Sequence, residues 1–563
     1  MDDVLCGLAA NPALPPELVD RLIAVADDDL AWALTDRVDL SRPQALALAR
    51  RDEGAAAVLA REGRLTAADI DPAVRPDAAL ALLESGAGGP ELARLLVVDP
   101  DVLRRERLAA CPGLPSDVVD RLAADPDVRV VAELALWAPP DLAARLAFHP
   151  HSEVRGAVAA NKRTPPGILA MLVTGEGIPP ARWCQVCERE ATPFVHPPNC
   201  PRPTCRLWSG AACDGTHQSA VHGMHEQALG NPATPAGVAA GFAGHPSTPL
   251  RLRLAARPDL TPEICRRLSA DPSPRVRAEL AANPALDETR IRVLAADRDP
   301  EVRRGLAFHP RVPLDVLGLL AGTARIGSTL LPRIAAASPA EVDGLARSPH
   351  PVVRMLLAER RDLPGRVRDL LAADADAKVL KSIAVHPGLS ERQLRAMVDR
   401  HGDRVIARVA GNPDATPALL EDLVRHDPPV RRVLREVAAH GAATATALLA
   451  CLADERGRRA AAGDPALPPR SLAGLLDDDD CRVVRAAAAN PSLPLAVMAR
   501  LVPSVRGPSR RGAGARAGGA GRRDGVRRSR RDRHRWPATA TSAAVADFGA
   551  GTAATVPGTT AAP

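Results

Sequence analysis

Residues 283–310 read NPALDETRIRVLAADRDPEVRRGLAFHP, which is one unit of a repeat that fills most of the chain. The unit runs from one Asn-Pro pair to the His-Pro pair that opens the next. The same marker recurs every 26 residues at Asn231, Arg257, Asn283 and His309, each followed by proline. A fixed period of this kind is the signature of a repeat architecture. The sequence therefore predicts an array of stacked units.

A second marker keeps the same period over a longer distance. Val276-Arg277 recurs as Val484-Arg485, eight periods downstream. Asp99-Pro100 and Asp125-Pro126 are also 26 residues apart, whereas the units before about residue 85 are less regular. This coherence favours one continuous lattice along the chain.

Each unit has a simple physical interpretation. The Asn/His/Asp-Pro pair ends the preceding helix, because proline disfavours helical backbone at the residue before it. A proline in the next first turn starts a short amphipathic helix such as residues 262–270, with Ile264 and Leu268 on one face. A second apolar segment closes the unit, and only stacking on its neighbours can bury the apolar faces.

These motifs, NP-x-L-P/T-P-x-x-L-x-x-L followed by D-P-x-x-x-V-R-x-x-L-A, resemble the leucine-rich repeat variant family over roughly residues 8–174 and 226–503. The resemblance implies an all-α, right-handed superhelical solenoid that alternates α- and 3₁₀-helices. Because the 26-residue unit is slightly longer than the family's, the second segment has room for a full α-helix. Longer HEAT-like helical pairs are the alternative. About 17 or 18 units are expected.

Composition agrees with a stack of small helices. Only 2% of the 563 residues are aromatic and tyrosine is absent. The net charge of +6 comes from the tail, where 12 arginines against three aspartates after residue 505 give +9 and leave −3 for the rest. We expect this Arg/Gly/Ala-rich tail, residues 504–563, to be disordered. It ends the last repeat without the polar cap that a solenoid normally needs.

The N-terminus lacks the pattern of a signal peptide, and no apolar run is long enough to cross a membrane. We therefore expect a bacterial cytoplasmic protein with no membrane partner and with reduced thiols.

The period breaks once. Asn161 and Asn231 are 70 residues apart, 44 more than one period. Four parts are predicted: an N-terminal repeat array at 1–174, a Cys/His-rich metal-binding insertion at 175–226, a C-terminal repeat array at 227–503, and the tail at 504–563.

The insertion holds five of the ten cysteines, at 184, 187, 200, 205 and 213. Cys184-x₂-Cys187 and Cys200-x₄-Cys205 are two pairs that suit tetrahedral zinc. His196 can replace one thiolate. A small module in a reducing compartment needs such a staple. Free thiols without metal are the remaining possibility.

Residues 213–217, Cys-Asp-Gly-Thr-His, resemble the signature of CDGSH iron–sulfur proteins, which implies Cys213 and His217 as ligands of a [2Fe–2S] cluster. The C-x-C pair that this family places upstream is missing. Members of the leucine-rich repeat variant family can also carry an iron–sulfur module. A zinc site that uses Cys213 and His217, or two metals sharing six ligands, fits the same residues. The predicted metal ligands are therefore Cys184, Cys187, Cys200, Cys205, Cys213 and His217.

Other candidates have simpler interpretations. His222 and His225 can extend a metal site but suit a solvated helix face. The single cysteines of the repeats are expected to pack as small apolar residues. One lattice position carries a ladder of arginines, which predicts either an anion track or pairing with the aspartate of the preceding Asp-Pro turn, such as Asp271 or Asp299. The members of this ladder are Arg129, Arg155, Arg277, Arg303, Arg354, Arg431 and Arg485.

No enzyme motif is present: the sequence has no phosphate-binding loop, no nucleophile elbow and no HExxH. The sequence favours a non-enzymatic repeat scaffold that docks a protein partner and contains structural zinc. The alternatives are an iron–sulfur redox or sensor protein and a nucleic-acid-binding helical-repeat protein.

Overall fold

The computed structural model describes residues 2–188, 191–202, 205 and 207–503, which belong to one compact unit, Met1–Val505. The predicted tail, residues 504–563, lies outside the described residues. The described chain is built from short helices with one two-stranded sheet, so the prediction of an all-α repeat solenoid is confirmed.

The unit at residues 283–310 shows how the sequence forms its two helices. Asp287 caps α19 (Glu288–Ala295) by accepting from the Arg290 amide, and Asp299 caps α20 (Pro300–Ala307) by accepting from the Glu301 amide. Such caps satisfy amides that a helix start leaves unpaired. Both helices bury leucine and alanine on one side.

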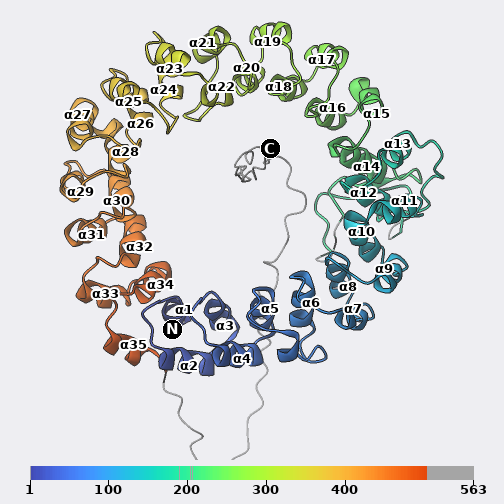
Figure 1. Cartoon of the computed structure of the whole chain (residues 1–563), viewed down its shortest axis with the longest axis horizontal. Helices are drawn as coiled ribbons and strands as arrows, with labels where there is room; N and C mark the ends of the chain where they lie inside the picture. The colour runs from blue at the N-terminus through green and yellow to red at the C-terminus, as the bar shows by residue number, and fades with distance from the viewer. Residues whose placement is uncertain (1, 189–190, 203–204, 206, 504–563) are drawn as a thin grey trace, which may run out of the picture. The chain divides into compact units, whose positions relative to one another are not determined.

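The first helices of the units form the outer of two layers (Figure 1). Its members are α2 (Pro16–Val25), α4 (Arg42–Arg51), η1 (Ala67–Asp69), α7 (Pro90–Leu96), α9 (Ser116–Ala123), α11 (Pro140–Leu146), α13 (Pro166–Thr174), α15 (Ala236–Ala240), α17 (Pro262–Ser269), α19, α21 (Leu314–Thr323), α23 (Pro339–Ala346), α25 (Gly365–Ala372), α27 (Glu391–His401), α29 (Pro417–Val424), α31 (Ala445–Cys451), α33 (Pro469–Leu475) and α35 (Leu495–Leu501).

The second helices form the inner layer, in which most helices pack against the second helix of the next unit. Its members are α1 (Asp2–Ala9), α3 (Asp28–Thr35), α5 (Glu53–Arg61), α6 (Pro76–Glu84), α8 (Val102–Ala109), α10 (Val128–Trp137), α12 (Ser152–Ala160), α14 (Gln218–Gly230), α16 (Thr248–Ala255), α18 (Pro274–Ala281), α20, α22 (Pro332–Ala335), α24 (Pro351–Leu357), α26 (Ala377–Ile383), α28 (Ile406–Ala410), α30 (Arg431–Ala438), α32 (Glu455–Gly463) and α34 (Cys481–Ala489).

Most units are therefore pairs of α-helices, which decides between the two kinds of unit that the sequence allowed. Short 3₁₀ segments occur only locally among the described residues: η1 takes the place of an outer helix, η2 (Gly241–Gly244) extends α15, and η3 (Gly402–Arg404) precedes α28. Pairing outer and inner members gives eighteen units, provided that α35 is paired with α1.

The asparagine of the Asn-Pro marker joins neighbouring units. The Nδ2 atom of Asn283 donates to the carbonyls of Ala255 (2.6 Å) and Arg257 (2.7 Å) in the preceding unit, and its Oδ1 accepts from the Ala285 amide (2.8 Å). The side chain is buried. The marker thus ends a helix and also satisfies buried carbonyls that would otherwise cost free energy. The sequence interpretation recognised only the first role.

Other residues at the marker position make the same kind of bond. The Nδ1 atom of His309 accepts from the Arg311 amide at 3.1 Å, so its Nε2 carries the proton and donates to the Asn283 carbonyl at 2.9 Å. Burial lowers the pKa of His309, which keeps the ring neutral for this role. Arg257 reaches the Leu229 and Asn231 carbonyls, both at 3.1 Å.

The array closes on itself. Helix α1 packs against α34, and the two lie side by side in Figure 1. The Nδ2 atom of Asn11 donates to the carbonyls of Ala488 (2.9 Å) and Asn490 (2.7 Å), which repeats the bonds of Asn283. In the outer layer, Arg21 donates to the Pro503 carbonyl at 3.3 Å. The first unit thus covers the apolar end of the last, which explains why the sequence shows no polar cap.

Two members of the arginine ladder, Arg277 and Arg354, join neighbouring units. The Nε atom of Arg277 pairs with the carboxylate of Asp297 at 2.8 Å, and its Nη1 donates to the Asp271 carbonyl at 2.8 Å. Arg354 bonds in the same way to Asp374 and to the Ser348 carbonyl. At these two positions the predicted carboxylate partner was wrong, because the preceding turn presents its backbone carbonyl and the following turn its carboxylate. Arg129, in contrast, pairs with Asp127 of the turn that precedes it (2.7 Å).

Among the described residues, no helix is long and apolar enough to span a membrane.

Candidate metal centre

The inserted module leaves the array after α13 and returns at α14. It rests on the start of α12, where the Ser152 amide donates to the Trp183 carbonyl (3.0 Å) and the Gln185 amide donates to Glu153 Oε1 (2.8 Å). The lattice is unbroken beneath it. The Nδ2 atom of Asn231 donates to the carbonyls of Ala159 and Asn161, both at 2.9 Å. The module is therefore an addition to a complete stack.

A short hairpin organises the module. Strand β1 (Phe194–Val195) pairs antiparallel with β2 (Ala212–Cys213), so that Phe194 lies opposite Cys213. This pairing returns the chain to the Cys184–Cys187 turn. A small apolar cluster of Cys184, Val186 and Cys213, with Phe194 packed against it, is separate from the core of the repeats.

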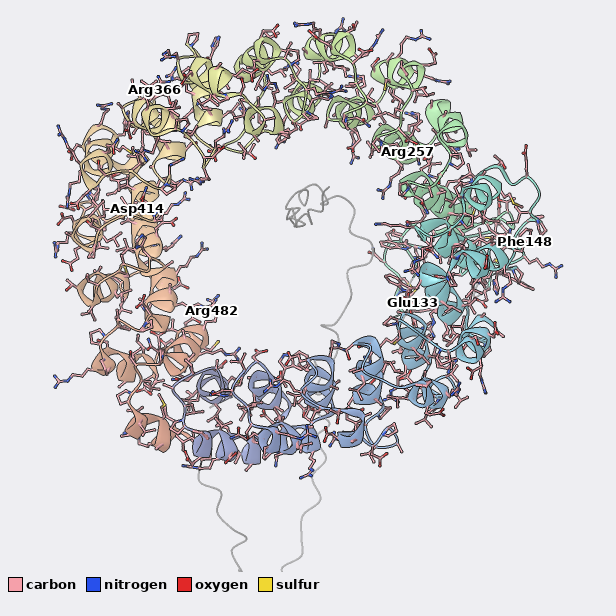
Figure 2. All side chains as sticks on the ribbon, viewed as in Figure 1. Glu133, Phe148, Arg257, Arg366, Asp414 and Arg482 are labelled. Atoms are coloured by element: carbon pink, nitrogen blue, oxygen red, sulfur yellow. The ribbon has the colours of Figure 1, made fainter. Side chains whose placement is uncertain are left out.

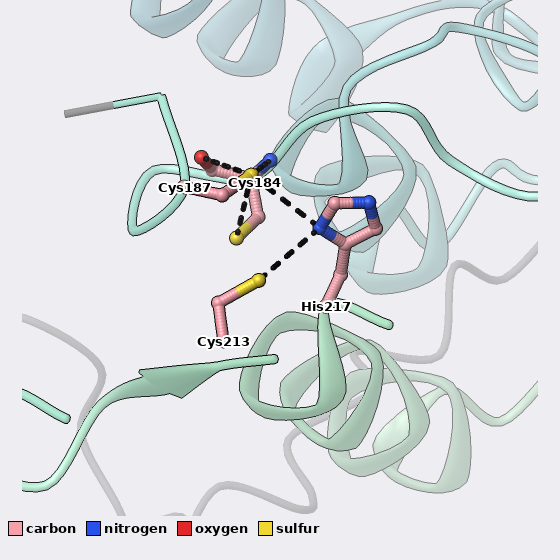
Figure 3. Close-up of side chains that lie close together, drawn as sticks. All are labelled: Cys184, Cys187, Cys213 and His217. Atoms are coloured by element: carbon pink, nitrogen blue, oxygen red, sulfur yellow. Dashed lines mark hydrogen bonds between the residues drawn. The ribbon is translucent and has the colours of Figure 1, made fainter. Parts of the chain in front are cut away.

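Four side chains from the two ends of the module converge in a Cys₃His group: Cys184, Cys187, Cys213 and His217 (Figure 3). Their potential ligand atoms all lie within 4.8 Å of one another. The Sγ atoms of Cys184 and Cys187 are 3.7 Å apart. The Nδ1 atom of His217 is 3.6 Å from the Sγ atoms of both Cys187 and Cys213.

These separations match the edges of a tetrahedral metal site. Metal–sulfur bonds of about 2.3 Å and metal–nitrogen bonds of about 2.0–2.1 Å give edges of about 3.8 Å between two sulfurs and about 3.6 Å between sulfur and nitrogen. The printed separations of 3.7 and 3.6 Å agree with both values. The Cys₃His group can therefore hold one metal ion.

Local backbone structure orients the ligands. The Cys184 amide points at Cys187 Sγ (3.2 Å) and the Gly215 amide at Cys213 Sγ (3.4 Å), contacts that would stabilise thiolates. Among the described residues, His217 alone combines a side chain with a positive φ (57°). Such a conformation is unfavourable for histidine and is concentrated at functional sites. This backbone conformation turns the ring of His217, the residue immediately before α14, toward the three sulfurs.

Burial separates this group from solvent. Cys184 and Cys213 are only 1% and 0% exposed, and His217 is 6% exposed. Burial raises the pKa of Cys184 to about 12. Without a cation these cysteines would be neutral thiols in an apolar cluster, whereas a bound metal ion would favour the thiolates that ligate it.

A second group consists of His196, Cys200 and Cys205, whose potential ligand atoms also lie within 4.8 Å of one another. The Nε2 atom of His196 is 3.1 Å from Cys205 Sγ, which is shorter than the edge of about 3.6 Å in a tetrahedral site. His196 is 6% exposed, and the hairpin fixes it because its amide donates to the Ala211 carbonyl at 2.8 Å. Residues 203, 204 and 206, next to Cys205, lie outside the described residues.

All six predicted ligands therefore lie in groups that can hold a metal, but the structure divides them differently from the favoured set of four thiolates. Cys184 and Cys187 join Cys213 and His217, while Cys200 and Cys205 join His196. The Cys-Asp-Gly-Thr-His stretch supplies two members of the first group. The division depends on the hairpin, which the sequence did not reveal.

The other candidates lie outside both groups. His222 contacts Ser247 Oγ at 2.7 Å, and the ring of His225 packs edge-on against Phe242 with centroids 5.3 Å apart. Four of the single cysteines are buried as predicted: Cys6, Cys111, Cys265 and Cys451. The prediction is wrong for Cys481, which is exposed because it is the first residue of α34 and projects away from the core.

Comparisons with known proteins do not identify a family. No family model matches the chain, and no curated protein matches it. Among the solved structures that match is an engineered protein from a structural genomics consortium, with 17% sequence identity over 87% of this chain and 98% of that one. The TM-score of 0.14 is too low for this likeness to carry an argument.

Proposed function

We propose that the protein is a non-enzymatic binding scaffold of the leucine-rich repeat variant kind, in which one zinc ion holds the inserted module in shape. The Cys₃His group carries this proposal. Four potential ligand atoms from two distant parts of the module lie within 4.8 Å of one another, and structural zinc sites are closed and four-coordinate.

The same geometry supports zinc over an iron–sulfur cluster. A [2Fe–2S] cluster divides its protein ligands between two irons, whereas a mononuclear ion gathers all of them in one sphere. The sulfur and nitrogen atoms here have the separations of one sphere. On this proposal, the likeness of residues 213–217 to the CDGSH signature reflects a turn that would let Cys213 and His217 bind the same ion.

Metal analysis of the anaerobically purified full-length protein tests the metal. We expect a colourless protein with one tightly held zinc, and a second, weaker equivalent if the His196 group is also loaded. Cobalt substitution should give the intense visible bands of a tetrahedral thiolate site, and Cys213→Ser should abolish them. A brown protein containing iron and acid-labile sulfide would overturn the zinc assignment in favour of the iron–sulfur alternative.

Exposed aromatic side chains around the module support a docking role for this part of the surface. Trp183 is 48% exposed and Trp208 is 71% exposed, while Phe148, labelled in Figure 2, precedes the Pro150 carbonyl that the module contacts. Large aromatic residues are enriched in protein interfaces, and exposing them without a partner is unfavourable. We place the protein partner on this surface.

A capture experiment tests the partner. The full-length protein with Trp183→Ala and Trp208→Ala should lose partners that the parent chain retains, with its zinc content unchanged. The matched control is Trp32→Ala, which removes a half-exposed indole from α3. Equal capture by both variants would place the docking surface elsewhere or exclude a protein partner.

A further inference from the structure

The inner layer carries a band of exposed basic side chains over five consecutive units, α26 to α34. We call this set the basic band. Its members are Lys378 and Lys381, Arg404 and Arg408, Arg431 and Arg432, Arg456 and Arg459, and Arg482 and Arg485. Within the bounds of these five helices the sequence has eleven lysines and arginines against two glutamates, Glu436 and Glu455. The band is thus strongly positive although the array as a whole is mildly acidic.

The spacing places the cations on one side of each helix. Members of a pair are mostly three or four residues apart, so they share a helix face. The buried residues of the same helices, such as Val433 and Val483, occupy the other face. Figure 2 shows Arg482 on the inner side of α34. Because α28, α30, α32 and α34 pack side by side, their pairs follow one another from unit to unit.

Most of these cations have no role in stacking the units. Among the described residues, ion pairs involve only Arg432 with Glu436 (3.5 Å), Arg482 with Asp480 (3.1 Å) and Arg485 with Asp3 (2.9 Å). The other seven form no ion pair with a described residue. Arg277 is different, because its guanidinium is mostly buried against Asp297. The band therefore offers positive charge that the fold does not use.

An open hollow between α30 and α32 lies within the band. It has a volume of about 490 Å³ and is lined by Arg456 and Arg459 together with small residues such as Ala438, Ala460 and Gly463. Asp464 also borders it. Small walls let an extended anionic backbone approach the two guanidinium groups, and guanidinium binds phosphate oxygens through two parallel hydrogen bonds.

The amino-acid composition of the part of the array that carries the basic band indicates which kind of polyanion it can bind. No phenylalanine, tryptophan or tyrosine occurs between Phe308 and the end of the described chain. Binding of single strands relies on bases stacked on aromatic rings, whereas duplexes are held through their phosphates by lysine and arginine. We propose that the basic band binds the phosphate backbone of double-stranded nucleic acid without sequence preference. The band shares only Arg431 and Arg485 with the predicted arginine track, whose other members bond to groups of their own array.

Binding of the full-length protein to a labelled DNA duplex of random sequence, followed by fluorescence anisotropy over a series of salt concentrations, tests the proposal. The variant is Arg456→Glu with Arg459→Glu. Its matched control is Arg392→Glu with Arg470→Glu, which makes the same charge change on exposed residues of α27 and α33 that form no ion pair with a described residue. Both proteins keep the arginine-rich tail, so its contribution cancels.

We expect the band variant to bind about tenfold more weakly, with a slope of log K against log salt shallower by about 2, because two phosphate contacts are lost. The control should bind like the parent chain. Equal weakening in both variants, or none in either, would overturn the proposal. So would displacement of the duplex by polyglutamate at equal charge concentration, since that would indicate an acidic protein as the ligand. If charge reversal unfolds the array by circular dichroism, Lys378→Ala with Lys381→Ala repeats the test on α26.

Discussion

The repeat units and the inserted module are held in their folded conformations by different means. A unit such as residues 283–310 buries leucine and alanine against its neighbours and fixes the joint with one asparagine. The module has a core of only a few residues, and its ends meet at three sulfurs and one imidazole. Stacking supplies enough buried apolar surface to dispense with a metal, whereas a lone segment of this size does not.

The largest expected effect breaks the module and spares the repeats. Cys213→Ser removes one corner of the tetrahedron, and we expect metal affinity to fall at least about 100-fold, because structural zinc contributes on the order of 10 kcal/mol to such small folds. Limited proteolysis should then cut within residues 175–217, while far-ultraviolet circular dichroism should change little.

Cys265→Ser is the control for that experiment, since Cys265 is a buried single thiol of α17. It should leave the metal content unchanged. Loss of helical signal in Cys213→Ser would show instead that the array depends on the module.

The next largest effect on stability is expected from the asparagines that link neighbouring units, and three of these links can be compared. Replacing Asn412, Asn231 or Asn11 by alanine removes two hydrogen bonds to carbonyls of the neighbouring unit, which should cost about 3 kcal/mol at each site. Chemical denaturation and hydrogen exchange of the neighbouring helices measure the loss.

Asn412→His should lose less, because His309 donates to the same kind of carbonyl at its own position. Equal losses at the three sites would show that the joint under the module and the joint between the chain ends are as strong as an ordinary one. A negligible loss at Asn11 would contradict closure of the array.

The effect of a glycine-to-alanine substitution on stability tests the closure more directly, because its sign should be opposite to the usual one. Alanine in place of a helical glycine normally stabilises by roughly 0.5–1 kcal/mol. A Cβ atom on Gly7 would lie 2.5 Å from the Arg485 carbonyl oxygen of α34, so Gly7→Ala should instead destabilise by about 2 kcal/mol. Thermal melting measures the difference.

Two other glycines provide comparisons for the effect of Gly7→Ala on stability. Gly305 approaches the Ala278 carbonyl oxygen of an ordinary neighbour in the same way, with a Cβ distance of 2.6 Å, so Gly305→Ala should also destabilise. Gly156 has open space around its Cβ position, and Gly156→Ala should stabilise. If Gly7 behaved like Gly156, helix α1 would be free of α34 in solution.

The smallest effect concerns the ion pairs between units. Asp297 accepts a hydrogen bond from Arg277, and this bond lowers the pKa of the Asp297 carboxyl by more than burial raises it. A depressed carboxyl pKa contributes stability above the unfolded pKa, near 3.9, and this contribution is lost as the pH falls through the folded value. Asp297→Asn should therefore cost about 1 kcal/mol at pH 7.

The matching measurement is urea denaturation of the parent chain and of Asp297→Asn at several pH values. The difference between the two proteins should shrink below about pH 4. Asp315→Asn is a control, since its partner Arg292 is half exposed and such pairs contribute little. A difference that persists in acid would mean that the amide disturbs packing and does not simply remove a charge.

The period of Asn-Pro markers was sufficient to predict a stack of short helical units, because the start and end of each helix depend on local sequence. The closure could not be predicted, since it depends on how small rotations between units accumulate until α1 reaches α34. The same limit applies to the module. Residue type and spacing identified the ligands, but their division between two groups depends on the pairing of Phe194 with Cys213 across the hairpin.

The closure also constrains how this gene can change. An open stack of repeats tolerates duplication or loss of a unit, because the ends simply move. Here Asn11 must meet Asn490, and α1 must complete the unit begun by α35. Adding or removing one unit would prevent the first and last units from meeting correctly. The geometry of closure therefore fixes how many units the array can contain. The positions of the chain ends are not fixed in this way, and a circular permutant cut at another turn should assemble the same stack.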